Sequence, residues 1–159
     1  HAWIAAGLPI EQQPNRATRS NYVARISGDE AVDKTWLRAH LGDPSLAIWD
    51  ARSRDEYHGV RALAARGGHI PGAVHHDWVD CMDRSRHLRL KDLEQLRATL
   101  ADLGITPDKD IVTHCQTHHR SGLTWLVGKL LGFPRIRAYP GSWSEWGNDP
   151  SLPVESTVE

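Results

Sequence analysis

The sequence predicts an α/β domain in which helices cover both faces of a central, mostly parallel β-sheet. Short apolar runs such as 46–49 and 111–114 are typical of strands buried on both faces. They alternate with longer segments of helical periodicity, which favours a parallel sheet. The 159 residues are 40% hydrophobic, enough for one domain that buries about two-thirds of its unfolded surface.

Each expected element has a local signal. Asp33 is a suitable N-cap for a helix that ends at Gly42. Ser53 can cap a brief helix, and Asp92 can cap a clear helix over 92–103. The expected strands and remaining segments, in chain order, are an edge strand at 22–26, a strand at 46–49, a loop over 59–72, a strand at 73–75, a helical turn at 78–82, strands at 111–114 and 135–139, and a short helix at 142–146.

A cysteine lies at the junction between the expected strand 111–114 and the helix that follows it. A tight loop runs from Cys115 to Arg120, and Gly132 is a reasonable end for the helix. The helical spacing predicts one buried stripe, made of Leu123, Leu126, Val127, Leu130 and Leu131. We therefore expect the thiol of Cys115 at a helix N-terminus.

The surroundings of Cys115 predict a reactive thiolate. Unpaired backbone N–H groups and the positive end of the helix dipole favour an anion there. Such surroundings lower a cysteine pKa from about 8.5 to a range of roughly 3.5–7.5. His118, His119 and Arg120 add donors and positive charge within the loop. A buried structural thiol is the alternative, but this composition favours a nucleophile that handles an anionic substrate.

Further polar and aromatic residues are expected at the same edge of the sheet, because ligands bind beyond the carboxyl ends of parallel strands. Asp50 and Arg52 lie at the end of the strand 46–49, and Trp78 follows the strand 73–75. We expect Asp50 and Arg52 to support the rim of the site through hydrogen bonds, with ordinary surface ion pairing as the alternative. Trp78 is expected to form a wall of the site or to pack in the core.

Composition excludes several classes of function. A net charge of −1 gives no bulk attraction for nucleic acid or an anionic membrane. No apolar run approaches the roughly 18 residues of a membrane span. Two cysteines, Cys81 and Cys115, are too few for a disulfide framework, and there is no signal peptide. We therefore expect a soluble, cytoplasmic protein with reduced thiols.

Residues 1–21 differ in composition from the rest of the chain. After Glu11 they are rich in Gln, Pro, Asn and Arg, as linkers are. The pattern Trp3…Leu8-Pro9-Ile10-Glu11 is also similar to Trp146…Leu152-Pro153-Val154-Glu155 near the end of the chain. This similarity indicates either an internal repeat or coincidence.

Four motifs in order carry a resemblance to a known family. They are Asp50-Ala51-Arg52-Ser53…Tyr57, Gly68-His69-Ile70-Pro71-Gly72-Ala73, the strand–Cys115–loop–helix unit, and Gly141-Ser142-Trp143…Trp146. As a set they resemble the rhodanese superfamily, which implies a rhodanese-like three-layer sandwich. The loop Cys-Gln-Thr-His-His-Arg is similar to that of two-domain bacterial members of the Azotobacter type. This similarity implies that 1–21 is the tail of a preceding inactive domain plus a linker, and that 22–159 is a catalytic domain that docks on that missing N-terminal domain.

The resemblance also implies a reaction. Members of this type are thiosulfate:cyanide sulfurtransferases, whose only cofactor-like species is a transient persulfide, here on Cys115. The persulfide forms as sulfite leaves, and its sulfur passes to cyanide or to a thiol acceptor such as a thioredoxin-like or biosynthetic protein. The loop expected to bind the donor and the persulfide consists of Gln116, Thr117, His118, His119, Arg120 and Ser121.

Other functions stay open at this point. A sulfur-relay module fed by a desulfurase, or a 3-mercaptopyruvate sulfurtransferase, would use the same cysteine. Tyrosine phosphatases share His114-Cys115…Arg120, but their loops place one residue more between Cys and Arg than the four found here, and the shorter ring suits a single sulfur better. His118 and His119 together with His114 and Cys115 suggest zinc ligands, yet the usual paired spacings are absent, so no metal is expected.

Two positions depart from animal thiosulfate sulfurtransferases. Glu56 stands where those enzymes carry an arginine, and Thr117 stands where they carry a lysine. Both differences remove positive charge expected to bind the donor, so the identity of the physiological donor stays open. Cys81 is expected to be a spectator, with a resolving thiol as the alternative.

Overall fold

The computed structural model describes residues 1–25 and 28–156. Within these residues one sheet contains the strands β1 (Leu46–Asp50), β2 (Ala73–His75), β5 (Asp110–His114) and β6 (Ile136–Ala138). The strands lie in the order β2-β1-β5-β6, and each neighbouring pair is parallel. The predicted parallel sheet is confirmed.

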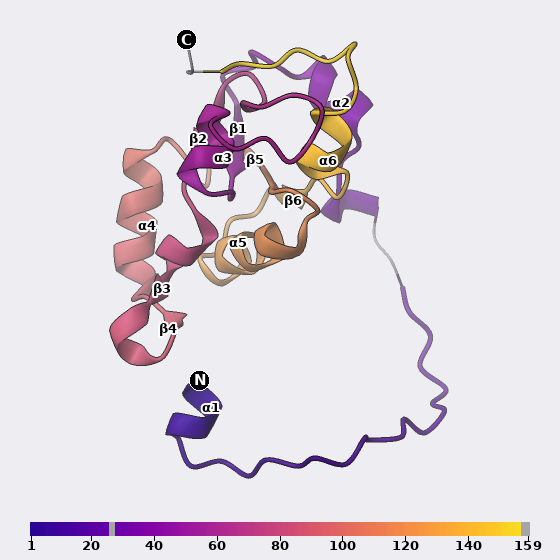
Figure 1. The fold of residues 1–159 in the computed structure, drawn as a ribbon, viewed down its shortest axis with the longest axis vertical. Helices are drawn as coiled ribbons and strands as arrows, with labels where there is room; N and C mark the ends of the chain where they lie inside the picture. Colours follow the sequence, from indigo (N-terminus) through magenta and orange to yellow (C-terminus); the bar gives the residue numbers. More distant parts are fainter. Residues whose placement is uncertain (26–27, 157–159) are drawn as a thin grey trace.

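Helices cover both faces of the sheet, so the domain has three layers (Figure 1). The helices of the domain are α2 (Lys34–Ala39), α3 (Arg54–His58), α4 (Leu93–Asp102), α5 (His119–Leu130) and α6 (Ser142–Trp146). Helices α4 and α5 pack in one apolar cluster with Trp49 of β1, whereas α2, α3 and α6 pack in a second cluster with Ile48. Because side chains alternate along a strand, these two neighbours serve opposite layers. The predicted sandwich is confirmed.

The predicted helix caps are present. The carboxylate of Asp33 accepts a hydrogen bond from the Trp36 N–H at the start of α2, and that of Asp92 accepts two at the start of α4. Ser53 and Glu56 form a reciprocal capping box at α3. Helix α2 ends at Ala39, a turn earlier than its expected end at Gly42.

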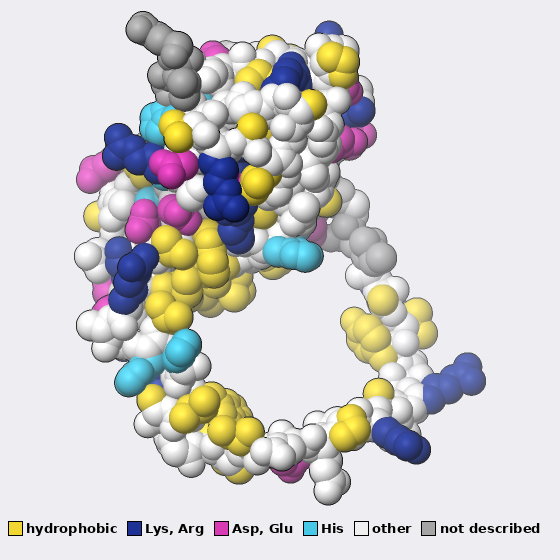
Figure 2. Space-filling model, viewed as in Figure 1, with side chains coloured by type: hydrophobic (Ala, Val, Ile, Leu, Met, Phe, Trp, Pro, Cys, Tyr) yellow, Lys and Arg dark blue, Asp and Glu magenta, His cyan; other side chains and the backbone are white. Residues whose placement is uncertain are grey.

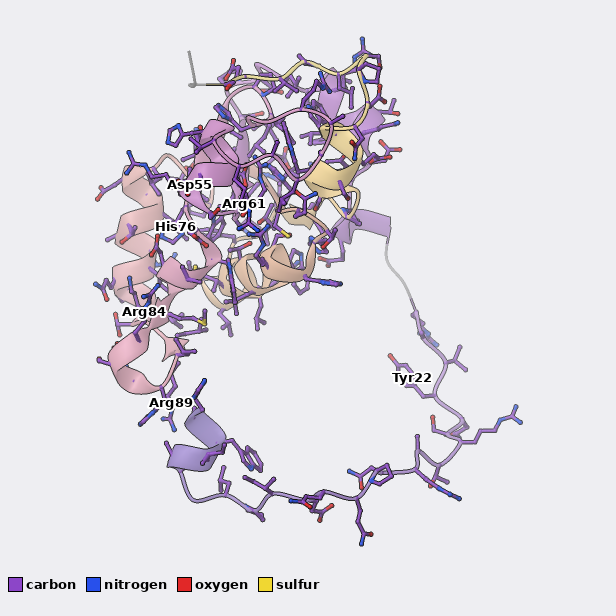
Figure 3. The ribbon with its side chains drawn as sticks, viewed as in Figure 1. Tyr22, Asp55, Arg61, His76, Arg84 and Arg89 are labelled. Carbon is purple, nitrogen blue, oxygen red and sulfur yellow. The ribbon has the colours of Figure 1, made fainter. Side chains whose placement is uncertain are left out.

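The predicted edge strand at 22–26 is wrong over the residues that can be compared. Residues 22–25 form no strand, and Ile26 lies outside the described residues. The Tyr22 side chain is 81% exposed and lies on the N-terminal segment, away from the sheet (Figure 3). The edge position beside β6 is taken instead by Ala31, which forms a parallel bridge with Ala138. The segment around Ala31, later in the chain than 22–26, therefore pairs with the free edge of β6.

The predicted buried stripe of α5 is also partly wrong. Leu126 and Leu130 are 45% and 50% exposed. The buried face consists instead of Ser121, Thr124, Val127, Gly128 and the following Leu131. Small residues occupy this face because the helix approaches the sheet closely: a side chain at Gly128 would collide with Ile136.

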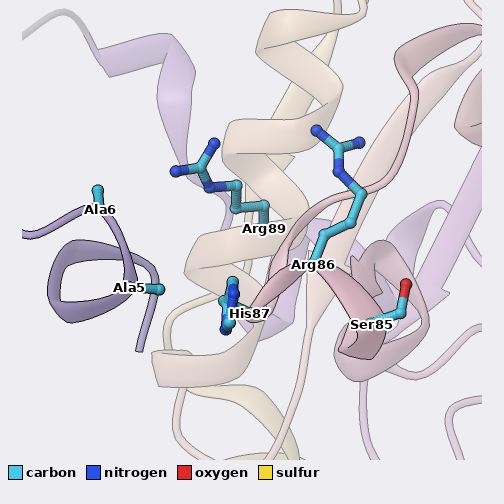
Figure 4. A pocket seen from close by; sticks show the side chains of 6 residues that line it. All are labelled: Ala5, Ala6, Ser85, Arg86, His87 and Arg89. Atoms are coloured by element: carbon cyan, nitrogen blue, oxygen red, sulfur yellow. The ribbon is translucent and has the colours of Figure 1, made fainter.

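The excursion between β2 and α4 was predicted only in part. The helical turn expected at 78–82 is confirmed as η2 (Trp78–Cys81). The rest was not predicted: β3 (Met82–Asp83), η3 (Arg84–Arg86) and β4 (Arg89–Leu90), in which β3 pairs with β4 in antiparallel fashion. The tip of this hairpin and the end of α1 (Ala2–Ala5) border a pocket (Figure 4). Its lining consists of Ala5, Ala6, Ser85, Arg86, His87 and Arg89. None of these residues belongs to the cysteine loop, so this pocket is separate from the site described below.

The N-terminal segment lies apart from the layered body. After α1, residues 6–25 are exposed and carry no regular structure, and they arch away from the domain (Figure 2). Large apolar side chains on this segment are exposed, namely Trp3, Ile4, Leu8, Ile10, Tyr22 and Val23. The core of the domain is thus built without them. No helix in the described part of the chain is both long and apolar enough to span a membrane.

Candidate active site

The carboxyl ends of three strands meet at one edge of the sheet. Asp50 at the end of β1 is in register with His75 at the end of β2 and with His114 at the end of β5. Cys115 follows His114 directly. The sheet therefore brings the expected thiol and the expected supporting carboxylate to the same rim.

Backbone hydrogen bonds hold the loop after Cys115 in place. The N–H groups of Trp143 and Ser144, at the start of α6, each donate at 2.9 Å to the carbonyls of Cys115 and Gln116. The Gln116 side chain donates at 3.0 Å to the carbonyl of Leu63. Segments that precede and follow the loop in the sequence thus hold it in place.

The loop is shorter than predicted. Helix α5 begins at His119 rather than after Arg120, so Arg120 lies in its first turn. His118 is the N-cap residue and has a left-handed backbone conformation, with φ of 65°. The early start of the helix turns additional N–H groups toward the cysteine.

Cys115 lies inside this ring of donors and is 1% exposed. Burial disfavours its ionisation, but hydrogen bonds from the Ser121 hydroxyl and from the N–H groups of Ser121, Thr117 and Arg120 outweigh it. The pKa of Cys115 is therefore lowered. This shift has the direction expected for a reactive thiolate, and hydrogen bonds are its main cause.

The remaining loop side chains lie in different surroundings. Thr117 and His119 are exposed. His118 is half-buried, and its Nδ1 atom lies 2.8 Å from Ser121 Oγ. Burial, with a smaller contribution from His119, lowers the pKa of His118. At neutral pH His118 therefore adds a hydrogen-bonding group to the loop rather than a positive charge.

Arg120 forms an ion pair that the sequence did not reveal. Its guanidinium donates two hydrogen bonds, at 2.7 and 2.8 Å, to the carboxylate of Glu56 on α3. Burial opposes the charge on Glu56, but the bonds from Arg120 and Ser53 prevail and lower its pKa from 4.5 to about 2. The pair therefore stabilises the fold above the ordinary Glu value, and this contribution is lost as the pH falls toward about 2. Much of the positive charge expected from Arg120 is compensated.

A buried network lies behind the loop. Arg52 donates hydrogen bonds to both carboxylate oxygens of Asp50, and the two side chains are 1% and 0% exposed. Arg52 also donates to the carbonyl of Gly68 and lies over the ring of Trp143, 4.4 Å from its centroid. Burial opposes ionisation of Asp50, but its interactions with His114 and with the Arg52 guanidinium lower its pKa. Because this pair is buried, the alternative of a surface ion pair is wrong.

His114 lies between this network and the cysteine. It is fully buried, and burial lowers its pKa. Its Nδ1 atom lies 3.2 Å from the carbonyl of Cys115, and its Nε2 atom lies 3.6 Å from Asp50. A neutral imidazole can donate from Nδ1 to the carbonyl of the reactive residue, whereas its Nε2 atom is buried near Asp50 without a hydrogen-bond partner.

Comparison with known proteins agrees with this geometry. The sequence model of the family described as the rhodanese-like domain matches residues 33–149 of this chain. The chain belongs to the rhodanese family. It is 49% identical to the thiosulfate sulfurtransferase of Azotobacter vinelandii and 46% identical to that of Pseudomonas aeruginosa. Each alignment covers 97% of this chain but 56% of the relative, so the chain spans little more than half the length of these proteins.

A solved structure confirms the rhodanese fold. The structure of an EanB variant in complex with ergothioneine superposes with a TM-score of 0.88 at 26% identity. The superposition covers 99% of this chain and 39% of that one.

Two further residues of the rhodanese domain were singled out from the sequence. Trp78 is half-buried in η2, which packs against α5, so its role as a wall of the site stays a prediction. Cys81 is fully buried, and burial raises the pKa of its thiol to about 12. Its thiol is therefore protonated at neutral pH.

Among the described residues, no group of three or more His, Cys, Asp or Glu side chains is arranged to hold a metal ion.

Ser142 is a contributor whose role sequence reasoning missed. Its hydroxyl accepts a hydrogen bond from the Cys115 N–H at 3.4 Å and donates to the Tyr139 carbonyl at 3.0 Å. It is fully buried and has a positive φ of 53°, unusual for a residue with a side chain. The Gly141-Ser142-Trp143 motif had marked the rhodanese family, but only the fold shows that it holds the cysteine backbone.

Proposed function

We propose that this rhodanese domain is a thiosulfate:cyanide sulfurtransferase that acts through a persulfide on Cys115. The observation that carries the proposal is the buried sulfur of Cys115 within a ring of hydrogen-bond donors, which lowers its pKa. The naming of two relatives as thiosulfate sulfurtransferases supports it. The ring suits one sulfur atom that carries negative charge.

The reaction proceeds in two transfers. The Cys115 thiolate attacks the outer sulfur of thiosulfate, an S–S bond forms, and the bond to the sulfonate sulfur breaks with its electron pair on the departing sulfite. The product is a Cys115 persulfide anion whose terminal sulfur is held by the loop donors. Cyanide then attacks that sulfur, thiocyanate leaves, and the Cys115 thiolate is regenerated. No cofactor takes part in the proposed cycle.

A sulfur-relay function is the second candidate, and the ion pair between Glu56 and Arg120 favours it. A site for a free dianionic donor gains from uncompensated positive charge, whereas Arg120 is paired here. A persulfide delivered by a desulfurase, and a thiol acceptor on a thioredoxin-like or biosynthetic protein, would rely less on that charge. Both free cysteines fit the reducing cytoplasm that such partners occupy.

We also propose that residues 1–21 are the tail of a preceding inactive rhodanese domain plus a linker. The two similar Trp–Pro segments make the same contact: Trp3 Nε1 donates to the carbonyl of Pro9 at 2.9 Å, and Trp146 Nε1 donates to that of Pro153 at 2.7 Å. Trp146 is fully buried, whereas Trp3 is 57% exposed. Trp3 thus has the local geometry of a domain terminus without a core around it.

Extending the chain N-terminally by one domain length tests this assignment. In each protein, the emission spectrum of Trp3 is obtained by subtracting the spectrum of a Trp3→Phe variant. Burial of Trp3 in the first domain should place this emission at shorter wavelength in the extended protein than in the present chain. The same wavelength in both proteins would contradict the assignment.

Intact-mass measurement after thiosulfate treatment tests the sulfurtransferase proposal. Without reducing agent, we expect the protein to gain one sulfur atom, which cyanide removes and which peptide mapping places on Cys115. Cys115→Ser should abolish the adduct, whereas Cys81→Ser should retain it because Cys81 is a buried, protonated thiol. Absence of an adduct on Cys115 would contradict the proposal, and turnover of a phosphorylated substrate would favour the phosphatase alternative. Turnover with protein acceptors compared with cyanide separates the relay from the transferase.

A further inference from the structure

His118 has a backbone conformation that requires compensation. Its φ of 65° and ψ of 1° lie in the left-handed region, which a residue with a Cβ atom rarely adopts because of steric strain. In this conformation the imidazole of His118 is half-buried, and its Nδ1 atom lies 2.8 Å from Ser121 Oγ. Strain at a loop residue next to a reactive group suggests a functional contact. The contact that His118 gains is the one to Ser121.

The Ser121 hydroxyl has two neighbours that compete for one proton. Ser121 is fully buried, and its hydroxyl oxygen lies 2.8 Å from His118 Nδ1. The same side chain makes the largest hydrogen-bonding contribution to the lowered pKa of Cys115, which places its hydroxyl beside the sulfur. The Thr124 hydroxyl, which is also close, donates to the Ser121 carbonyl instead. A serine hydroxyl carries a single hydrogen. It therefore points either to the imidazole or to the sulfur.

The tautomer of His118 decides between these two arrangements. With hydrogen on Nε2, Nδ1 is an acceptor and draws the Ser121 proton away, so a serine lone pair faces the sulfur. With hydrogen on Nδ1, the imidazole donates to Ser121 Oγ, and the serine proton faces the sulfur. Only the second arrangement stabilises a thiolate. The lowered pKa of His118 makes the tautomer of the neutral ring the relevant variable.

We propose that His118 is a positioning residue that, as the Nδ1–H tautomer, directs the Ser121 hydroxyl proton toward the sulfur of Cys115. The chain of donors runs from His118 Nδ1 through Ser121 Oγ to Cys115 Sγ. This role refines the proposed persulfide chemistry, but it concerns the thiolate of the resting protein and can be measured without any sulfur donor.

The tautomer itself is observable by ¹⁵N NMR of histidine-labelled protein at neutral pH. We expect the Nδ1–H form of His118 in the wild-type protein. In Cys115→Ala the sulfur acceptor is gone, so Ser121 is free to donate to the imidazole, and the signal should shift toward the Nε2–H form. Observation of the Nε2–H form in the wild-type protein would overturn the proposal.

A double-mutant cycle on the pKa of Cys115 provides the second test. His118→Gly removes the imidazole at a φ that glycine adopts freely, so this variant is expected to fold. Below the pKa, we expect the rate of Cys115 alkylation to fall about tenfold, which corresponds to a pKa higher by about one unit. Ser121→Ala should lower the rate at least as much, and adding His118→Gly to it should cause no further loss.

His87→Gly is the matched control, because His87 is also a left-handed histidine, with φ of 58°, but is exposed on the hairpin away from the loop. It should leave the alkylation rate of Cys115 unchanged. Additive losses from His118→Gly and Ser121→Ala, or an unchanged rate in His118→Gly, would overturn the proposal. A positive result in this cycle together with no persulfide after thiosulfate treatment would refute the proposed function and leave the role of His118 intact.

Discussion

Replacement of Arg52 with methionine will lower the free energy of unfolding by about 3–5 kcal/mol, the range found when one partner of a buried ion pair is removed. Asp50 is 0% exposed, and Arg52 donates hydrogen bonds to both of its carboxylate oxygens. Without Arg52 the carboxylate must either stay charged without its cationic partner or take up a proton. Urea denaturation at neutral pH measures the loss.

Two variants control this experiment. Asp50→Asn combined with Arg52→Met should be more stable than Arg52→Met alone, because no unpaired charge is buried. Arg97→Met removes an ion pair with Glu94, whose side chain is 81% exposed, and a hydrogen bond to the Leu131 carbonyl, and should cost about 1–2 kcal/mol. If Arg52→Met destabilises the protein no more than Arg97→Met does, Asp50 does not depend on Arg52, and the network is not the support of the rim.

The elements that the sequence predicted correctly have signals close together in the chain. Each of the caps formed by Asp33, Ser53 and Asp92 acts on an N–H group within three residues. The position of Cys115 at the end of a strand likewise follows from its neighbours, and the meeting of strand ends follows from a parallel sheet. Local chemistry and a general rule of topology together located the site.

The errors concern contacts between distant segments. The buried face of α5 depends on how closely the helix approaches Ile136, and that distance favours Gly128 and Thr124 over the exposed leucines. The sheet edge expected to hold 22–26 is taken by Ala31. The partner of Arg120 lies 64 residues away on another helix. The sequence pattern of one segment does not reveal which distant segment will contact it in the fold.

That distant partner changes the view of how the loop treats anions. The sequence treated Glu56 only as a missing arginine, and Arg120 as a free cation beside the cysteine. In the fold these two observations are one ion pair. Ser121 and backbone N–H groups make the largest contributions to stabilising the thiolate. The guanidinium of Arg120 also interacts with Cys115, but its strongest partner is Glu56, which therefore sets how much of its charge is left for an anionic donor.

Glu56→Gln will therefore strengthen the binding of anionic donors. Glutamine preserves the capping box of α3, since either residue can serve at that position, but it no longer neutralises Arg120. An uncompensated unit charge a few ångströms from a dianion contributes on the order of 1–2 kcal/mol at a partly exposed site, so the KM for thiosulfate should fall about tenfold. Steady-state kinetics with cyanide as acceptor measure the change.

The charge of the ligand and the salt concentration distinguish this explanation from a general change in the loop. Competitive inhibition by sulfate, a dianion, should strengthen more in Glu56→Gln than inhibition by nitrate, a monoanion, because Coulomb energy scales with charge. Both gains should shrink as ionic strength rises. Equal gains for the two anions, or an unchanged KM, would show that Arg120 serves to hold α3 against α5 and that Glu56 does not set the specificity for the donor.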